Sequence, residues 1–292
     1  MKNGQPSFTA LTAAAARAAH LVVDGEPVIF ADTLASALLG ERAEELLSYH
    51  TSHGTHPVLA GARAQVTCRG RYTEDALARA VGRGVTQYVV LGAGLDSFAY
   101  RSGGLAGGRR LRVFEVDHPA TQDWKRSALA DARVTVPDGV AFVPADLAAG
   151  ALAGRLAAAG FDSSAPAFVS WLGVTMYLTG DAIAATLAAI GALAPGTEVI
   201  ADYMLPAELR DEEGAVYGSL VAQAAAERGE PWLSCFAPDE MADLARAAGF
   251  AAVRNVRQRD TIPAPLWRRQ DALRPAALAM LLHGTAGGAV NG

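Results

Sequence analysis

Short runs of apolar and β-branched residues recur along the middle of the chain, and each run stops at a glycine, a proline or an acidic residue. Stretches with the spacing of amphipathic helices separate these runs. Strands that alternate with helices in this way indicate parallel pairing, with helices on both faces of the sheet. The pattern predicts five such strands, at residues 86–94, 111–119, 140–147, 167–174 and 197–204.

The segments on either side of this alternating block are predicted to be mainly helical. Residues 8–85 contain helical sequence only and are expected to cover the sheet from the N-terminal side. Residues 206–249 carry the sequence of two or more helices, and residues 251–260 are expected to supply a late strand. The end of the chain, residues 281–292, is rich in glycine and alanine and is expected to fray.

These boundaries organise the chain around one predicted core. Residues 1–85 form an N-terminal helical cover of the same domain, residues 86–265 form the core with a helical insertion at about 206–249, and residues 266–292 form a C-terminal tail. The element order predicts an α/β fold with a doubly wound, mostly parallel sheet. In such sheets a ligand binds just beyond the carboxyl ends of the central strands.

Composition narrows the classes of function. A chain of 292 residues with 51% hydrophobic content can bury a large core. The net charge is −5 and no long Lys/Arg block occurs, so nucleic acid is not expected as a partner. No signal-peptide pattern and no run of about 18 apolar residues is present, and we expect a cytoplasmic protein without a membrane span. Cys68 and Cys235 lie in no CxxC pair and predict buried or incidental thiols.

Candidate binding residues stand at three successive strand ends. Gly92 and Gly94 follow the first strand and let the backbone turn tightly beside an atom group that a Cβ would exclude. Asp117 ends the second strand, at about the 20-residue offset where an acidic side chain binds ribose hydroxyls. Asp146 and the Leu147 amide end the third strand, where they could bind an adenine. The alternative for each motif is local: a tight turn for the glycines, a helix N-cap for either aspartate.

The glycine turn favours one adenosine compound over another. A dinucleotide site continues to a third glycine, which packs the helix close to the pyrophosphate. This chain has no third glycine, and Asp96 stands where it would repel a phosphate. A cationic adenosine compound without phosphate, S-adenosylmethionine, therefore suits the pocket better than a nucleotide of an oxidoreductase.

Four stretches of the sequence resemble the leucine carboxyl methyltransferase family, including its bacterial branch of S-adenosylmethionine-dependent enzymes. The resemblance runs from about residue 8 to residue 260 and is carried by "LGAGLDSFAYR", "FEVDHP", "ADL" and the upstream "RGRYTEDAL". It implies a class I methyltransferase fold, which is Rossmann-like and seven-stranded. It also implies an enzyme that transfers a methyl group from S-adenosyl-L-methionine to an oxygen.

The resemblance also implies roles for individual residues. It assigns Arg69 to the cofactor carboxylate, with Arg71 as the alternative for the same role. The resemblance places Gly92 and Gly94 at the methionine part, Asp117 at the ribose, and Asp146 with Leu147 at the adenine. It also implies Ala93, His118 and Leu172 as cofactor-binding residues. His118 could instead cap the helix that begins at Pro119.

Two positions depart from the family pattern. Leu172 stands where the eukaryotic enzymes and many bacterial relatives carry a glutamate, and Thr33 replaces a proline in the N-terminal segment expected to cap the pocket. Tyr177 still matches, and its phenol could orient a substrate oxygen or simply fill the rim. An ion pair between Arg101 and Glu115 is also expected, because a buried Glu115 would need a partner.

The chemistry implied by these residues is an in-line displacement, in which the enzyme aligns the reactants and excludes water. A carboxylate acceptor is ionised at pH 7, whereas a phenol would benefit from a base, and no base dyad or metal-ligand cluster is evident. We therefore expect methylation of a carboxylate of a small molecule or peptide, in natural-product biosynthesis. A phenol or hydroxyl acceptor, and a non-catalytic S-adenosylmethionine-binding partner subunit, are the alternatives; oligomeric state stays open.

Overall fold

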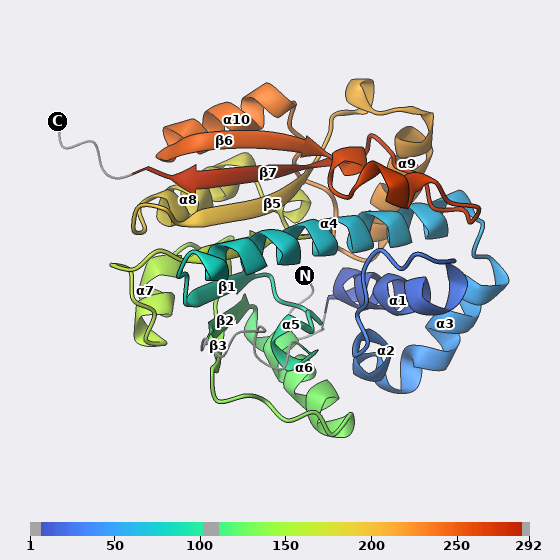
Figure 1. Ribbon diagram of the computed structural model, residues 1–292, viewed down its shortest axis with the longest axis horizontal. Coiled ribbons are helices and arrows are strands. Elements are labelled where there is room, and N and C mark those ends of the chain that lie inside the picture. The colour runs from blue at the N-terminus through green and yellow to red at the C-terminus, as the bar shows by residue number, and fades with distance from the viewer. Residues whose placement is uncertain (1–6, 102–110, 288–292) are drawn as a thin grey trace.

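A seven-stranded sheet forms the centre of the computed structural model, which describes residues 7–101 and 111–287 (Figure 1). The strand order is β3-β2-β1-β4-β5-β7-β6. The strands are β1 Gln87–Leu91, β2 Arg112–Asp117, β3 Val140–Pro144, β4 Phe168–Trp171, β5 Glu198–Met204, β6 Phe250–Arg257 and β7 Ala279–Ala286. The first five pair in parallel, which confirms the predicted α/β class and the five predicted strands.

The position of β7 contradicts the expectation that the end of the chain frays. Residues 281–287 were expected to fray, but β7 lies between β5 and β6 and pairs antiparallel with both. Pairing on two sides satisfies the backbone groups of this strand, which overrides its low intrinsic strand propensity. Residues 288–292 lie outside the described part of the chain. The late strand expected at 251–260 is confirmed as β6.

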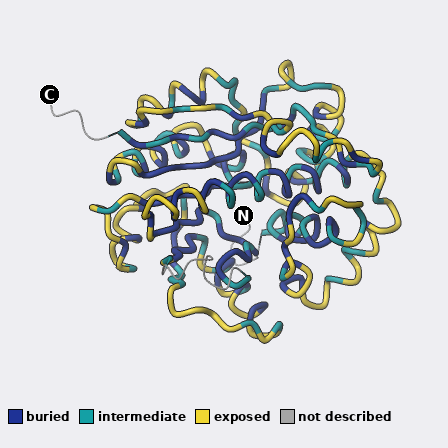
Figure 2. The backbone as a smooth tube through the Cα atoms, in the orientation of Figure 1, coloured by how far each residue is buried: buried dark blue, intermediate teal, exposed yellow. Residues whose placement is uncertain are grey.

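The described residues form ten α-helices. Some of them pack on one face of the sheet and some on the other. The helices are α1 Phe8–Val23, α2 Ala35–Leu38, α3 Ala43–Ser52, α4 Pro57–Gly82, α5 Phe98–Arg101, α6 Pro119–Asp131, α7 Leu152–Ala158, α8 Gly180–Gly191, α9 Glu212–Glu227 and α10 Pro238–Ala247. Side chains of α7, α8 and α10 pack on one face of the sheet, and those of α4 and α5 pack on the other. Strands β1, β4 and β5 are buried along their whole length between these layers, where Figure 2 colours the chain dark blue.

The N-terminal helices gather at the beginning of α4 (Figure 1). Helix α1 contacts α2, α3 and α4, and its alanines leave room for close packing. A further apolar cluster joins α1 and α2 to Leu95 of the loop after β1 and to Leu129 of α6. The cover is therefore attached to the same edge of the sheet at which the predicted binding residues lie.

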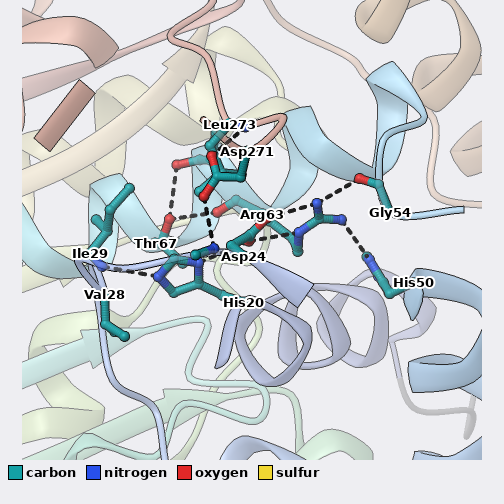
Figure 3. A network of polar contacts seen from close by, with 12 residues as sticks. His20, Asp24, Val28, Ile29, His50, Gly54, Arg63, Thr67, Asp271 and Leu273 are labelled. Carbon is teal, nitrogen blue, oxygen red and sulfur yellow. Dashed lines mark hydrogen bonds and ion pairs between the residues drawn. The ribbon is translucent and has the colours of Figure 1, made fainter. Parts of the chain in front are cut away.

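A buried arginine of α4 joins this helix to the other helices of the N-terminal cover (Figure 3). Arg63 is fully buried and donates to both carboxylate oxygens of Asp24, at 2.8 and 2.9 Å, and to the Gly54 carbonyl at 2.6 Å. Nδ1 of His20 lies 2.9 Å from Asp24, while its Nε2 accepts the backbone N–H of Ile29. His50 lies 3.3 Å from the Arg63 guanidinium. One cation therefore joins α1, α3 and α4.

The position of His50 makes this network sensitive to pH. Burial, and then the neighbouring Arg63 cation, lower the pKa of His50 from 6.5 to about 4. Between these two pH values the unfolded chain binds a proton at His50 that the folded protein does not bind. The free energy of unfolding therefore falls as the pH drops through this range.

Replacing His50 by glutamine should flatten this pH dependence, because an amide oxygen can still accept from Arg63 and cannot titrate. From pH 7 to pH 5 the wild-type protein should lose about 2 kcal/mol more unfolding free energy than His50→Gln. Urea denaturation of both proteins at a series of pH values measures the difference. Parallel curves for the two proteins would contradict the assignment.

Candidate active site

The glycine turn after β1 is fastened to the end of β2. The backbone N–H groups of Gly92 and Ala93 both donate to the Val116 carbonyl, at 2.8 and 3.1 Å. The Gly94 N–H donates to Oδ2 of Asp117 at 2.6 Å. The structure thus brings together the three turn residues and the aspartate that the sequence selected from separate strand ends.

Both glycines of the turn adopt positive φ angles, +66° for Gly92 and +42° for Gly94. A Cβ on Gly92 would lie 2.2 Å from Cγ2 of Val174, in the segment after β4. A Cβ on Gly94 would lie 3.0 Å from the Ala10 side chain in the first turn of α1. Conformation and close approach therefore both require glycine at position 92.

Asp117 and His118 follow β2 with different partners. Asp117 accepts the N–H groups of Gly94 and His118, each at 2.6 Å. Burial raises the pKa of Asp117, and these two hydrogen bonds oppose the rise. The His118 Nδ1 accepts the Ala120 N–H at 3.3 Å, so this residue caps α6, as the alternative interpretation had it.

Asp146 and Leu147 lie in the turn after β3, beside the end of β2. Asp146 is exposed, and one of its carboxylate oxygens accepts the Ala148 N–H at 2.9 Å. Leu147 packs its side chain against the apolar core. Among the hydrogen bonds of residues 7–101 and 111–287, none uses the Leu147 amide. An exposed carboxylate and an open N–H thus stand next to each other.

The two candidate arginines of α4 point to different places. Arg69 places Nη1 2.6 Å from Oδ2 of Asp202, two residues before the end of β5, and 14% of the Arg69 side chain is exposed. Arg71 instead pairs with Asp75 of its own helix and donates to the Ile29 carbonyl. Of the two arginines, Arg69 is therefore the one that reaches the strand ends.

Position 173 explains how Arg69 reaches the sheet. Gly173 has a φ of +76°, and a Cβ there would lie 2.7 Å from Nη2 of Arg69. Its N–H donates to Oδ1 of Asp202 at 2.6 Å. Gly173 and Asp202 were missed by sequence reasoning, although an aspartate inside the otherwise apolar run "TEVIADYM" was a signal for the second.

Tyr177 lies where three segments meet. It ends the 3-10 turn η2, Thr175–Tyr177, and burial raises its pKa, while Thr9 and Trp232 lower it. The buried carboxylate of Glu230 accepts the Thr9 N–H at 3.2 Å. The start of α1 and the segment after α9 therefore cover Tyr177. Leu172, by contrast, packs on the apolar face under α4.

The expected ion pair between Arg101 and Glu115 is wrong. Arg101 pairs with Glu74 of α4 and donates to the Ser97 hydroxyl at 2.9 Å. Glu115 pairs with Lys125 of α6 at 2.7 Å, because α6 packs closer to this position of β2. Burial raises the pKa of Glu74 to about 7, and Arg101 opposes the rise.

The described residues contain neither a metal-ligand cluster nor a helix that could span a membrane. No group of three or more His, Cys, Asp or Glu residues that could hold a metal ion occurs within residues 7–101 and 111–287. Over the same residues, every helix is too short or too polar to cross a bilayer.

Comparison with known proteins places these features in a family. The sequence profile of the leucine carboxyl methyltransferase family matches residues 10–191. YktD of Bacillus subtilis, which carries the name of an S-adenosyl-L-methionine-dependent methyltransferase, is 31% identical over 86% of this chain and 88% of its own length. A similarly named protein of Frankia alni, FRAAL3718, is 38% identical over 44% of this chain and 43% of its own length.

The fold has solved counterparts. A crystal structure of a protein from Thermobifida fusca, described as a methyltransferase, superposes with a TM-score of 0.59 at 20% identity. The superposition covers 98% of this chain and 97% of that one. It confirms the predicted class I methyltransferase-like fold.

The glycine at position 92 can be tested by substitution. Gly92→Ala should lower the unfolding free energy by about 2 kcal/mol or more, because alanine at positive φ is strained and its Cβ meets Val174. Gly154→Ala is the matched control, since it lies within α7 with nothing within 4 Å of its Cβ, and should add about 0.5–1 kcal/mol. Urea denaturation measures both changes. Equal stabilities of Gly92→Ala and the wild type would refute the close approach.

Proposed function

The chain belongs to the leucine carboxyl methyltransferase family, and we propose that it transfers the methyl group of S-adenosyl-L-methionine to a carboxylate oxygen of a small molecule or peptide. Its dependence on S-adenosyl-L-methionine and its action as a methyltransferase follow from that family. The proposal concerns the methyl acceptor, a carboxylate. We place the reaction in the biosynthesis of a natural product rather than in methylation of a protein phosphatase, because Leu172 departs from the eukaryotic pattern.

The residues at the strand ends fit the cofactor. The turn from Gly92 to Gly94 offers backbone without Cβ atoms, which suits the methionine part. The Asp117 carboxylate suits ribose hydroxyls, and the exposed Asp146 with the open Leu147 amide suits the adenine edge. The meeting of these groups with the Arg69 cation at one edge of the sheet is the observation that carries the proposal.

The chain's own residues then have to align the reactants and exclude water. The bound cofactor supplies an electrophilic methyl group on a sulfonium. Arg69 and the glycine turn hold the amino-acid end, and Asp117 fixes the ribose, so that the methyl group has one position. Tyr177 orients the acceptor oxygen, while the contact between Thr9 and Glu230 closes the site above it.

The positions of the six histidines favour a carboxylate over a phenol as acceptor. Each has another role or lies away from the strand ends: His20 and His50 join the Arg63 network, His283 pairs with Glu198, and His56 and His118 cap helices. The sixth, His53, ends α3 at the surface. A phenol with a pKa of about 10 would benefit from a base such as a histidine, and these six have other partners or positions, whereas a carboxylate needs no base.

Calorimetric titration tests the cofactor site. S-adenosylmethionine and S-adenosylhomocysteine should bind the wild type, and NADH should not. Asp117→Ala should weaken both adenosyl ligands by about 10- to 100-fold, because a charge-assisted hydrogen bond to the ribose is lost. Asp138→Ala, at an exposed position between α6 and β3, should bind as the wild type does. If a folded wild-type sample binds neither adenosyl ligand, the cofactor site is wrong.

The class of acceptor has its own test. Purified protein and S-adenosylmethionine labelled in the methyl group are incubated with benzoate, a peptide with a free α-carboxylate and p-cresol. Label should appear with the carboxylates as methyl esters, which mild base hydrolyses to volatile methanol. Base-stable label on p-cresol alone would identify a phenol methyltransferase and overturn the carboxylate assignment.

A further inference from the structure

A buried carboxylate lies beside the end of β4. Leu172, the residue after this strand, packs into the apolar face under α4 and offers no charge there. Asp202 lies on the neighbouring strand β5, which pairs with β4 in the register Trp171 opposite Ala201. Its two carboxylate oxygens accept from the Gly173 N–H and from Arg69, each at 2.6 Å. The carboxylate at the end of β4 therefore comes from Asp202 of the neighbouring strand β5.

The ion pair between Arg69 and Asp202 has unused hydrogen-bonding capacity. A guanidinium has five N–H donors, and in the described part of the chain Arg69 makes one hydrogen bond, to Asp202. A carboxylate has about four acceptor positions, and two of those on Asp202 are occupied. Several N–H donors of Arg69 and about two acceptor positions of Asp202 therefore remain available to a ligand.

There is also space beside the pair. A cavity of about 30 Å³ borders both Arg69 and Asp202, and Gln65 and Tyr217 also line it. This volume exceeds the roughly 10–15 Å³ that one water-sized group requires. An ammonium group has about the size of a water molecule. Among the described residues that line the cavity, Arg69 and Asp202 alone are charged, so Asp202 is the anion available there to a small cation.

We propose that Asp202 and Arg69 together bind the zwitterionic amino-acid end of the cofactor, with Arg69 taking its carboxylate and Asp202 its ammonium. This inference rests on the proposed function and adds a binding residue to it. A paired cation and anion match a ligand that carries both charges. A ligand with a carboxylate but no ammonium would place a second negative charge beside Asp202 without a positive charge to balance it, and would bind less well.

The test compares three ligands on two proteins by calorimetry. The ligands are S-adenosylhomocysteine, its deaminated analogue in which hydrogen replaces the α-amino group, and 5′-methylthioadenosine, which lacks the amino-acid end. The wild type should bind S-adenosylhomocysteine about 10- to 100-fold more tightly than the deaminated analogue. Asp202→Asn keeps an oxygen for the Gly173 N–H, and should remove this preference while leaving 5′-methylthioadenosine unchanged. Asp138→Asn is the matched control and should behave as the wild type.

Two results would overturn the inference alone. The first is a wild type that binds S-adenosylhomocysteine and its deaminated analogue equally. The second is an Asp202→Asn variant that weakens both by the same factor, because Asp202 would then only position Arg69. A wild type that binds none of the three ligands would instead contradict the proposed function.

A second variant keeps the inference testable if Asp202→Asn does not fold. Arg69→Gln should weaken S-adenosylhomocysteine more than its decarboxylated analogue, since only the former has the carboxylate that Arg69 binds. Equal weakening of the two ligands would overturn the division of charges between Arg69 and Asp202. Thermal melting of each variant establishes that it is folded before titration.

Discussion

Two arginines of helix α4 fix the position of the N-terminal helices relative to the sheet. Arg63 and Arg69 lie six positions apart on α4; the first is bonded to Asp24 beyond α1, and the second to Asp202 of β5. Both aspartates are almost completely buried at their side chains. Buried ion pairs add little net stability, because desolvation offsets the attraction, but losing one partner costs about 3–5 kcal/mol. Their effect here is to fix geometry, since α4 cannot shift or rotate without breaking both pairs.

Strands could be predicted from the sequence where the local pattern of apolar residues matches the way the strand is paired and buried in the sheet. Strands such as β1 and β5 are buried along their whole length, and a buried strand in a parallel sheet is a continuous apolar run. Strand β7 was not predictable in this way. Its sequence "AMLLHGTA" contains Gly284, which lies against Phe250 and Val199, so the glycine serves close packing rather than flexibility. Long-range pairing decides that strand.

The candidate site likewise contains residues that local sequence predicts and residues that only long-range packing positions. The turn at Gly92 and the acid at Asp117 could be selected from sequence, because each follows its own strand and parallel strands bring their ends together. The partner of Arg69 could not be, because α4 and β5 are separated by more than a hundred residues and only packing sets their relative height. The same reason explains the wrong partner for Arg101: packing places Glu74 of α4 beside Arg101, and Lys125 of α6 beside Glu115.

Burial of the site favours the proposed chemistry for an electrostatic reason. Transfer of a methyl group from a sulfonium to a carboxylate turns two opposite charges into none, and a water-excluded site favours such a step. Methylation of a neutral phenol requires a proton to leave as well, and the same burial that raises the pKa of Tyr177 would raise that of a phenolic acceptor beside it. The closed contact of Thr9 with Glu230 thus assists one reaction and hinders the other.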